Sequence, residues 1–473
     1  MTADVVHATT AGVAAPVAGE AATSDATRSR SFSRPRAGLP WEVAGLAGVV
    51  LLGAVLIALH VRADPRLSPI DELQHVDYVV KAGQLHLPRL GETDGAVARH
   101  EIACRGVEAA FSPPPCASSD KAPNGAYPEN AIDTAASDPP LYYVITGLAA
   151  RAANGVIHTR SIVTLARLFG IVWLAAGVVL LWLAMRVLGI GLVVRMAVSA
   201  LVVTTPVVLH SNATVTSDAV LLLGGAAAFF TVLLWEQRRL PGWVVFLVAG
   251  LCGLTKIPCV LAVVAAGLYL AIRAARRRTL GEHPTRSRRE MVGMALASSA
   301  VAVGVVLLWL VIVHVRSIPG SPLSPSAASF RVDHFPVSRL LSQYSALVSP
   351  VSDPPVLAPL QGKITLAIVA AFNVLLLVAA FGGAALSRAG SRLEAIATSA
   401  AALMLVGGPA FVVAIYLSEH QVLPSIPHRY GLALVPMVAA ALAMILIKAW
   451  VRWTVIGLAA FASLYTLVHV ATV

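Results

Sequence analysis

Apolar residues in this chain gather into long blocks that short polar stretches separate. The blocks do not alternate with polar residues at every second position, as the strands of a membrane β-barrel do. Many approach the roughly 20 residues that a helix needs to cross about 30 Å of hydrocarbon. The pattern predicts an all-α polytopic membrane protein with about eleven transmembrane helices. They are expected at 41–60, 164–187, 192–209, 219–235, 243–254, 257–272, 291–314, 364–386, 395–417, 431–447 and 454–470.

Composition supports this fold class. The 473 residues are 57% hydrophobic and 12% charged, whereas a soluble chain carries about 25% charged residues. The net charge of +11 would suit a nucleic-acid partner, but the basic residues cluster in short turns between the spans. That distribution is typical of cytosolic loops. We therefore expect no nucleic acid, a multi-pass protein of the plasma membrane in contact with its lipids, a cytosolic N-terminus and an outer C-terminus.

The polar segments predict the domain organisation. Residues 1–40 are rich in Ala, Ser, Thr and Arg and have no apolar core near Met1, so we expect a disordered basic cytosolic tail. Residues 41–473 form the transmembrane domain. Its first extracytoplasmic loop, 62–160, is expected to contain an interfacial helix at about 138–153, and a second large loop spans 317–362.

Two apolar pieces, 243–254 and 257–272, are each shorter than an ordinary span and meet at Thr255-Lys256. Arg239 precedes the pair, and a dense basic run from Arg273 follows it. Both ends should therefore face the cytosol. The chain is expected to form a hairpin here, with Lys256 near its outer tip.

The densest group of ionisable residues follows the first span. Asp71, Glu72 and His75 lie within five residues, and charged groups at a membrane boundary are functional more often than not. One carboxylate could act as a general base while the other binds a cation or orients a sugar; a solvated loop start is the alternative. If a helix starts here, His75 shares a face with Asp71 as a ligand, an orienting group or an ordinary interfacial histidine.

Four further polar residues lie at predicted span ends, and three of them have a structural alternative. Asp138 either contacts substrate or caps the helix after Pro139-Pro140, and Asp218 either contacts substrate or caps the fourth span. Lys256 either binds a phosphate or extends to the interface. Arg429 has the planar fork that grips phosphate in a bidentate manner. All these residues are predicted on the outer face.

Four cysteines are present. Cys104 and Cys116 lie in the predicted extracytoplasmic loop, where a disulfide between them is expected; two unpaired thiols are the alternative. Cys252 and Cys259 lie at the tips of apolar segments and are interpreted as packing residues.

Several of these stretches occur in an order that resembles a known family. They are Pro69-Ile-Asp-Glu-Leu-Gln-His75, Ser137-Asp-Pro-Pro-Leu-Tyr-Tyr143, Asn212 to Asp218, Leu254-Thr-Lys-Ile-Pro258, and His428-Arg-Tyr430 followed by Pro436. The chain resembles a bacterial family of predicted membrane proteins of unknown function within the GT-C superfamily of polytopic glycosyltransferases. It departs at Ile70, where that family reads Pro-Asp-Glu without an insertion.

The resemblance implies an inverting transfer of a sugar from a polyprenyl-phosphate donor to an envelope glycan or lipid acceptor on the outer face. Asp71 would be the general base, and Glu72 would assist it or hold a divalent cation, a metal that Asp71, Glu72 and His75 could share. Lys256 and Arg429 would stabilise the leaving phosphate. The expected substrate-binding residues are His75, Asp138, Tyr142, Asn212, Asp218, Lys256, His428, Arg429 and Tyr430.

Two other classes of protein remain open at this stage. A transporter or flippase of a lipid-linked or acidic solute would use the same cations without a base, but the sequence shows no mid-span charges and no internal repeat. A non-catalytic scaffold of an envelope-synthesis complex would tolerate neutral residues at both positions 71 and 72.

Overall fold

The computed structural model describes most of the predicted transmembrane domain. Asp71 and nearly all of the predicted tail lie outside the described residues. The described ranges are 38–70, 72–107, 112–119, 121–157, 161–276, 286–357 and 362–472.

Long apolar helices form the bundle, as the sequence predicts, and the described residues contain no β-strand beyond isolated bridges. Eight of the described helices are long and apolar enough to cross a membrane. They are α1 (Leu39–Ala63), α5 (Ile162–Val187), η5 with α8 (Ser217–Glu236), α11 (Arg288–Arg316), α15 with its π-turn and α16 (Lys363–Leu386), α17 (Arg392–Glu419), η9 with α18 (His428–Ile445) and α19 (Ala449–Thr472).

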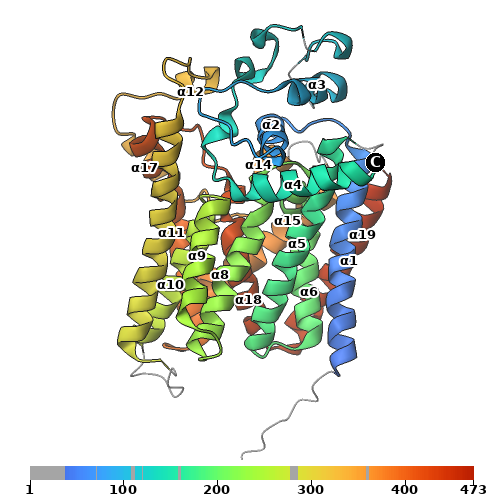
Figure 1. Cartoon of the computed structure of the whole chain (residues 1–473). Helices are drawn as coiled ribbons and strands as arrows, with labels where there is room; N and C mark the ends of the chain where they lie inside the picture. Colours follow the sequence, from blue (N-terminus) through green and yellow to red (C-terminus); the bar gives the residue numbers. More distant parts are fainter. Residues whose placement is uncertain are drawn as a thin grey trace, which may run out of the picture. The chain divides into compact units, whose positions relative to one another are not determined.

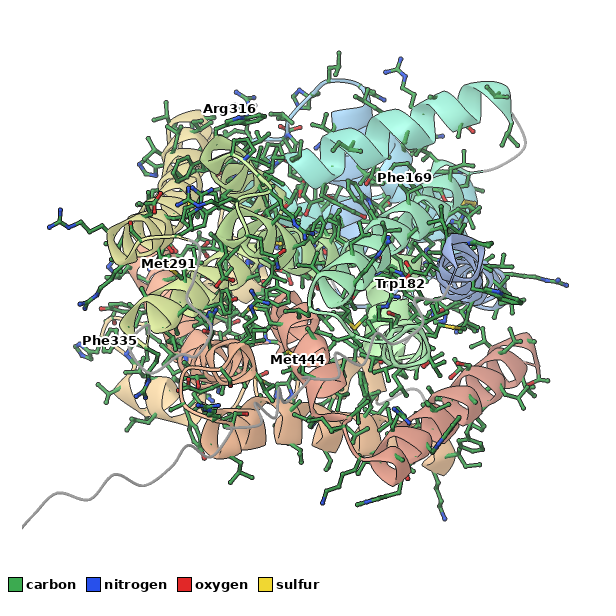
Figure 2. The ribbon with its side chains drawn as sticks, turned by 90° about the horizontal axis from the view of Figure 1, so that it is seen from below. Phe169, Trp182, Met291, Arg316, Phe335 and Met444 are labelled. Carbon is green, nitrogen blue, oxygen red and sulfur yellow. A yellow bond between two sulfur atoms is a disulfide. The ribbon has the colours of Figure 1, made fainter. Side chains whose placement is uncertain are left out.

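Burial differs sharply between these helices. α18 (Val435–Ile445) buries nearly every side chain, whereas α1 and α19 bury only one narrow stripe each. Figure 2 shows the same arrangement from below, with the Met444 end of α18 near the centre of the bundle and α19 at its periphery. The exposed faces of α1 and α19 are apolar, as helices in contact with lipid require.

The predicted span 192–209 is bent in the structure. The chain forms α6 (Leu192–Val203) and α7 (Pro206–Ala213), which meet at an angle of 63°. Pro206 has no N–H to continue α6, and Thr205 before it takes an extended backbone. The break turns α7 towards the first loop.

The two short apolar pieces are separate helices, α9 (Gly242–Thr255) and α10 (Cys259–Ala275), as predicted. Lys256 between them has an extended backbone. Lys256 pairs with Asp138 of the first loop, whereas Arg273 near the end of α10 pairs with Glu236 at the end of α8. The chain therefore reverses at Lys256. Together with the bent pair, α9 and α10 match the remaining predicted spans, but the number of membrane crossings stays a prediction.

Three helices from the first loop cover one end of the bundle, which we call the outer end (Figure 1). They are α2 (Glu72–Gly83), α3 (Ala96–Arg105) and α4 (Leu141–Val156). α4 lies across the ends of the long helices, so a helix is present where one was predicted, shifted by three residues at each end; its place at the membrane interface stays a prediction. Cys104 and Cys116 are joined by a disulfide in this loop. The second loop adds the short helices α12 (Pro325–Ser329), α13 (Val337–Ser342) and α14 (Pro354–Leu357).

Close packing of α5 against α7 leads to a first prediction. A Cβ at Gly170 would overlap the carbonyl of Asn212, whereas a Cβ at Gly48 of α1 would have no atom within 4 Å. Gly170→Ala should therefore destabilise the protein by about 1–3 kcal/mol, the usual effect of overpacking. Gly48→Ala is the matched control and should be neutral. Thermal unfolding in detergent measures both, and equal stability of the two variants would contradict this packing.

Candidate functional site

Glu72 begins α2 and forms a buried ion pair with Arg167 of α5. Arg167 donates from Nε and Nη2 to the two carboxylate oxygens, each at 2.7 Å. Neither side chain is more than 2% exposed. Arg167 also donates to the backbone oxygens of Asp64 and Arg66. These bonds attach the segment that follows α1 to helix α5.

Both oxygens of Glu72 are fully occupied. The first also accepts from the backbone N–H of Val215, and the second accepts from that of Ser68. Each carboxylate oxygen thus has two donors, which uses its lone pairs. This geometry suits a residue that holds Ser68, Arg167 and Val215 together. It leaves Glu72 no oxygen with which to accept a proton from substrate.

The predicted residues around Asp138 meet in one polar cluster. Tyr143 lies between His75 and Asp138, with its hydroxyl 2.6 Å from His75 Nδ1 and 2.6 Å from Asp138 Oδ2. Ser217 and Lys256 also donate to Asp138 Oδ2, each at 2.9 Å. α4 begins after Pro140 without a side-chain cap, so the capping alternative for Asp138 is wrong.

The cluster continues through Asp218 to the second loop. Lys256 Nζ lies 3.8 Å from Asp218 Oδ1, and Arg429 donates to Asp218 Oδ2 at 2.7 Å. Arg429 also pairs with Asp353 at 3.0 Å. Thr216, and not Asp218, caps the 3₁₀ turn η5 (Ser217–Val220) that leads into α8. We call the set His75, Asp138, Tyr143, Ser217, Asp218, Lys256, Asp353 and Arg429 the outer ionic network.

Opposite charges in this network are matched inside the protein. Lys256 is only 6% exposed, so the alternative that it extends to the interface is wrong. Burial alone would raise the pKa of Asp138, but the Lys256 ammonium and the His75 ring outweigh it, and the pKa falls to about 2. Asp138 is therefore a carboxylate at neutral pH, and it holds Lys256 in place.

The other predicted residues lie close to the network. Tyr430 presents its ring to Lys256 and Arg429, with centroid distances of 5.9 and 5.8 Å. His428 contacts the backbone oxygen of Ser352 through Nδ1 at 3.0 Å. Asn212 is buried in α7 and donates to the carbonyl of Val208. Tyr142 is buried and packs edge-on against the ring of Tyr143.

Sequence reasoning missed several residues of this region, among them Arg167, Tyr143 and Asp353. Arg167 is a charge near the outer end of a predicted span, and the cost of burying it was the signal that it needs a carboxylate partner. Tyr143, next to the predicted Tyr142, carries the hydrogen bonds instead, because it faces Asp138. Asp353 had no signal, since its partner Arg429 is 76 residues away in the chain.

A cavity of about 490 Å³ opens beside this region, a volume typical of small-molecule sites. Ser68, Pro69 and Ile70 line one side of it. The other walls come from the outer ends of α1 and α19, from α7, and from α14 and α15 (Lys363–Leu377). The cavity thus lies between the transmembrane helices and the first loop.

The described residues do not fit the predicted divalent cation. Glu72 has no unused oxygen, and Nδ1 of His75 contacts Tyr143. In the described part of the chain, the group with metal-ligand spacing is His100, Cys104 and Cys116, but the two sulfur atoms form the disulfide.

A second acidic cluster lies in the first loop. Asp77, Asp94 and Asp133 are each at most 5% exposed, and Lys81 pairs with Asp77 at 2.6 Å. Burial, and then the Asp77 carboxylate, raises the pKa of Asp94 to about 7. Burial, and then the Asp77 and Asp94 carboxylates, raise the pKa of Asp133 as well.

Comparison with known proteins gives fold-level similarity only. No protein-family model and no curated protein matches the chain. One similar structure is ArnT from Cupriavidus metallidurans bound to undecaprenyl phosphate, at 15% identity and a TM-score of 0.48. Another is the arabinofuranosyltransferase AftD from Mycobacteria, at 15% identity and a TM-score of 0.47.

The alignments cover 88% and 92% of this chain but 62% of ArnT and 27% of AftD, so the chain spans less than two thirds of either structure. At identities and TM-scores this low, the activities of these proteins are not transferred to it. The fold and the outer ionic network define an all-helical, multi-pass membrane protein with a buried polar site at one end of its bundle.

The Glu72–Arg167 pair leads to a second prediction. Arg167→Met leaves the Glu72 carboxylate buried without its cation, which should cost about 3–5 kcal/mol. Adding Glu72→Gln removes the charge while the amide oxygen still accepts from the backbone, so the double variant should be more stable than Arg167→Met alone. Thermal unfolding compares them, with Arg62→Met on the exposed end of α1 as control. A double variant no more stable than the single one would contradict this.

A third prediction concerns pH. Because the pKa of Asp94 is about 7 in the folded protein and near 3.8 ordinarily, the folded state binds its proton more tightly between these values. Stability should therefore rise as pH falls from 8 to 5, by roughly a few degrees in Tm. Asp94→Asn should be more stable than wild type at pH 8 and show a shallower pH dependence. The exposed Asp333→Asn should behave as wild type, and an unchanged slope in Asp94→Asn would contradict the assignment.

Proposed function

We propose that the chain is a glycosyltransferase that moves a sugar from a polyprenyl-phosphate donor to an envelope glycan or lipid acceptor. The transfer takes place at the outer end of the bundle and inverts the anomeric centre. The observation that carries the proposal is the cavity lined by Ser68, Pro69 and Ile70. Asp71, the candidate base, is the residue that follows Ile70 in the sequence.

Two features support a lipid-linked substrate. The cavity is bounded by α1 and α19, two long apolar helices that bury few of their side chains, so a ligand in it is close to the bilayer. Its lining combines apolar side chains with histidines and Arg66. An amphiphile with a polar head and an apolar tail matches such a boundary, whereas a soluble nucleotide sugar does not need one.

The chemistry is a single displacement. Asp71 accepts the proton of an acceptor hydroxyl, whose oxygen attacks the anomeric carbon. The bond from that carbon to the phosphate oxygen breaks, and polyprenyl phosphate leaves with the electron pair. Attack opposite the leaving group inverts the centre. The protonated carboxyl then returns its proton to water.

Glu72 and the outer ionic network serve this step as positioning groups. Glu72 holds the loop that carries Asp71, because its four donors come from three segments of the chain. The network joins the His75 ring, the Tyr143 hydroxyl and the Asp138 carboxylate in one buried hydrogen-bonded cluster, which holds α2 against the start of α4. Glu72→Gln is therefore expected to lower the amount of folded protein, while the protein that does fold keeps its transfer activity.

The fourth prediction tests the base. With radiolabelled polyprenyl-phosphate pentose and hexose donors and a membrane glycan extract, Asp71→Asn should lose at least about a hundredfold in transfer while still binding donor. Asp333→Asn, an exposed aspartate of the second loop, is the matched control and should transfer as wild type. Transfer by Asp71→Asn within threefold of wild type would exclude it as the base. A wild type that binds donors but releases no polyprenyl phosphate would point to a transporter or a scaffold.

A further inference from the structure

The outer ionic network is poorly suited to hold a phosphate, although it contains Lys256 and Arg429. These two cations face the three carboxylates of Asp138, Asp218 and Asp353, at 2.7–3.0 Å in the closest pairs. A phosphate would have to displace a buried carboxylate from its partner, which leaves that carboxylate uncompensated. The leaving phosphate should therefore bind elsewhere.

The cavity contains cationic and N–H donor groups that are not used in this way. Arg66 lines it, and among the described residues its guanidinium has no ion pair or side-chain hydrogen bond. His60 and His469 also line it without a side-chain hydrogen bond in the described part of the chain. His210 approaches the Ser68 hydroxyl at 3.5 Å, which is a weak contact.

These groups come from separate segments but converge on one space. His60 is at the outer end of α1, His210 near the end of α7 and His469 near the end of α19, while Arg66 lies in the loop after α1. Asp64 is the single carboxylate among the described lining residues. A neutral imidazole still donates one N–H, so the set offers donors to an anion at any protonation state. Arg66 offers the bidentate fork that suits phosphate oxygens.

The outer half of α19 provides a way out for an apolar tail. The buried residues of this helix are Val455, Ala459 and Ala462, and none of its last ten residues is buried. Beyond them Tyr465 and His469 are half-buried and face the cavity, while Leu464 and Val468 are 65% and 53% exposed. α1 and α19 lie side by side at the edge of the bundle (Figures 1 and 2). The cavity wall on this side is therefore a single helix with lipid beyond it.

We propose that this cavity binds the phosphate of a polyprenyl-phosphate ligand, with Arg66, His60, His210 and His469 around the phosphate oxygens and the prenyl chain passing α19 into the bilayer. The inference rests on the proposed function, because it places the phosphate of the proposed donor in the cavity. It also separates two tasks: the unpaired groups of the cavity bind the phosphate, and the paired groups of the network shape the sugar side.

The fifth prediction tests phosphate recognition by binding. Full-length protein in nanodiscs is titrated with polyprenyl phosphate and, separately, with polyprenol. Arg66→Gln and His469→Gln should each weaken polyprenyl phosphate binding about tenfold, because each removes a hydrogen bond to a charged group. Neither should change polyprenol binding. Arg62→Gln is the matched control, since Arg62 lies four residues before Arg66, is exposed and does not line the cavity.

Several outcomes would overturn the assignment. One is a Kd within twofold of wild type for both variants, and another is equal wild-type affinity for polyprenol and polyprenyl phosphate. Competition by phosphatidylglycerol at equal concentration would make the cavity a general phospholipid site, and competition by inorganic phosphate at equal concentration would show that the tail contributes nothing. Either competition result would contradict the assignment of the cavity to a polyprenyl-phosphate donor.

The transfer assay separates this inference from the proposed function. If wild type transfers sugar and Arg66→Gln and His469→Gln transfer equally well at limiting donor, the cavity assignment fails and the proposed function stands. If both variants lose polyprenyl phosphate binding but wild type transfers no sugar from any donor, the phosphate site stands and the glycosyltransferase proposal fails.

Discussion

The buried ion pair between Glu72 and Arg167 is the interaction on which the outer end of this protein depends. A buried pair contributes little net stability, because desolvation offsets most of the attraction, but its geometry is exacting. Here one carboxylate collects donors from the first loop, α5 and the segment before η5. It thereby fixes Ser68 at the cavity wall and the start of α2, so both the cavity and the position of His75 follow from it.

Two kinds of polar environment exist side by side at this end. In the outer ionic network each cation has a carboxylate within about 3 Å, and the side chains are nearly all buried. Such a network is rigid, because breaking one pair leaves a charge unpaired. The cavity has the opposite character, with half-buried histidines and an exposed arginine. A rigid ionic network beside a less tightly packed cavity suits the positioning of a flexible lipid-linked sugar.

Much of the architecture could be predicted from the sequence. Apolar block lengths placed the helices, and the positions of arginines indicated the reversal at Lys256, since both signals come from the cost of moving groups out of water. The kink at Pro206 also has a sequence signal, because proline lacks an N–H and disfavours a helical backbone at Thr205. A prediction based on the length of the apolar block did not use this signal. The candidate residues Asp138, Asp218, Lys256 and Arg429 were found by their places at span ends, and the structure brings them together.

Pairing is what the sequence could not supply. Whether Asp138 caps a helix or holds Lys256, and whether Asp218 caps a span or meets Arg429, depends on which loop ends approach each other. The cavity, likewise, is a space between α1, α7, α15 and α19 that no single segment encodes. The membrane helices and the ionisable residues at their ends can be read from the amino-acid sequence, because hydrophobicity and charge are local properties. Which charges neutralise one another and which remain available depends on the folded arrangement, because ion pairs form between segments distant in the chain.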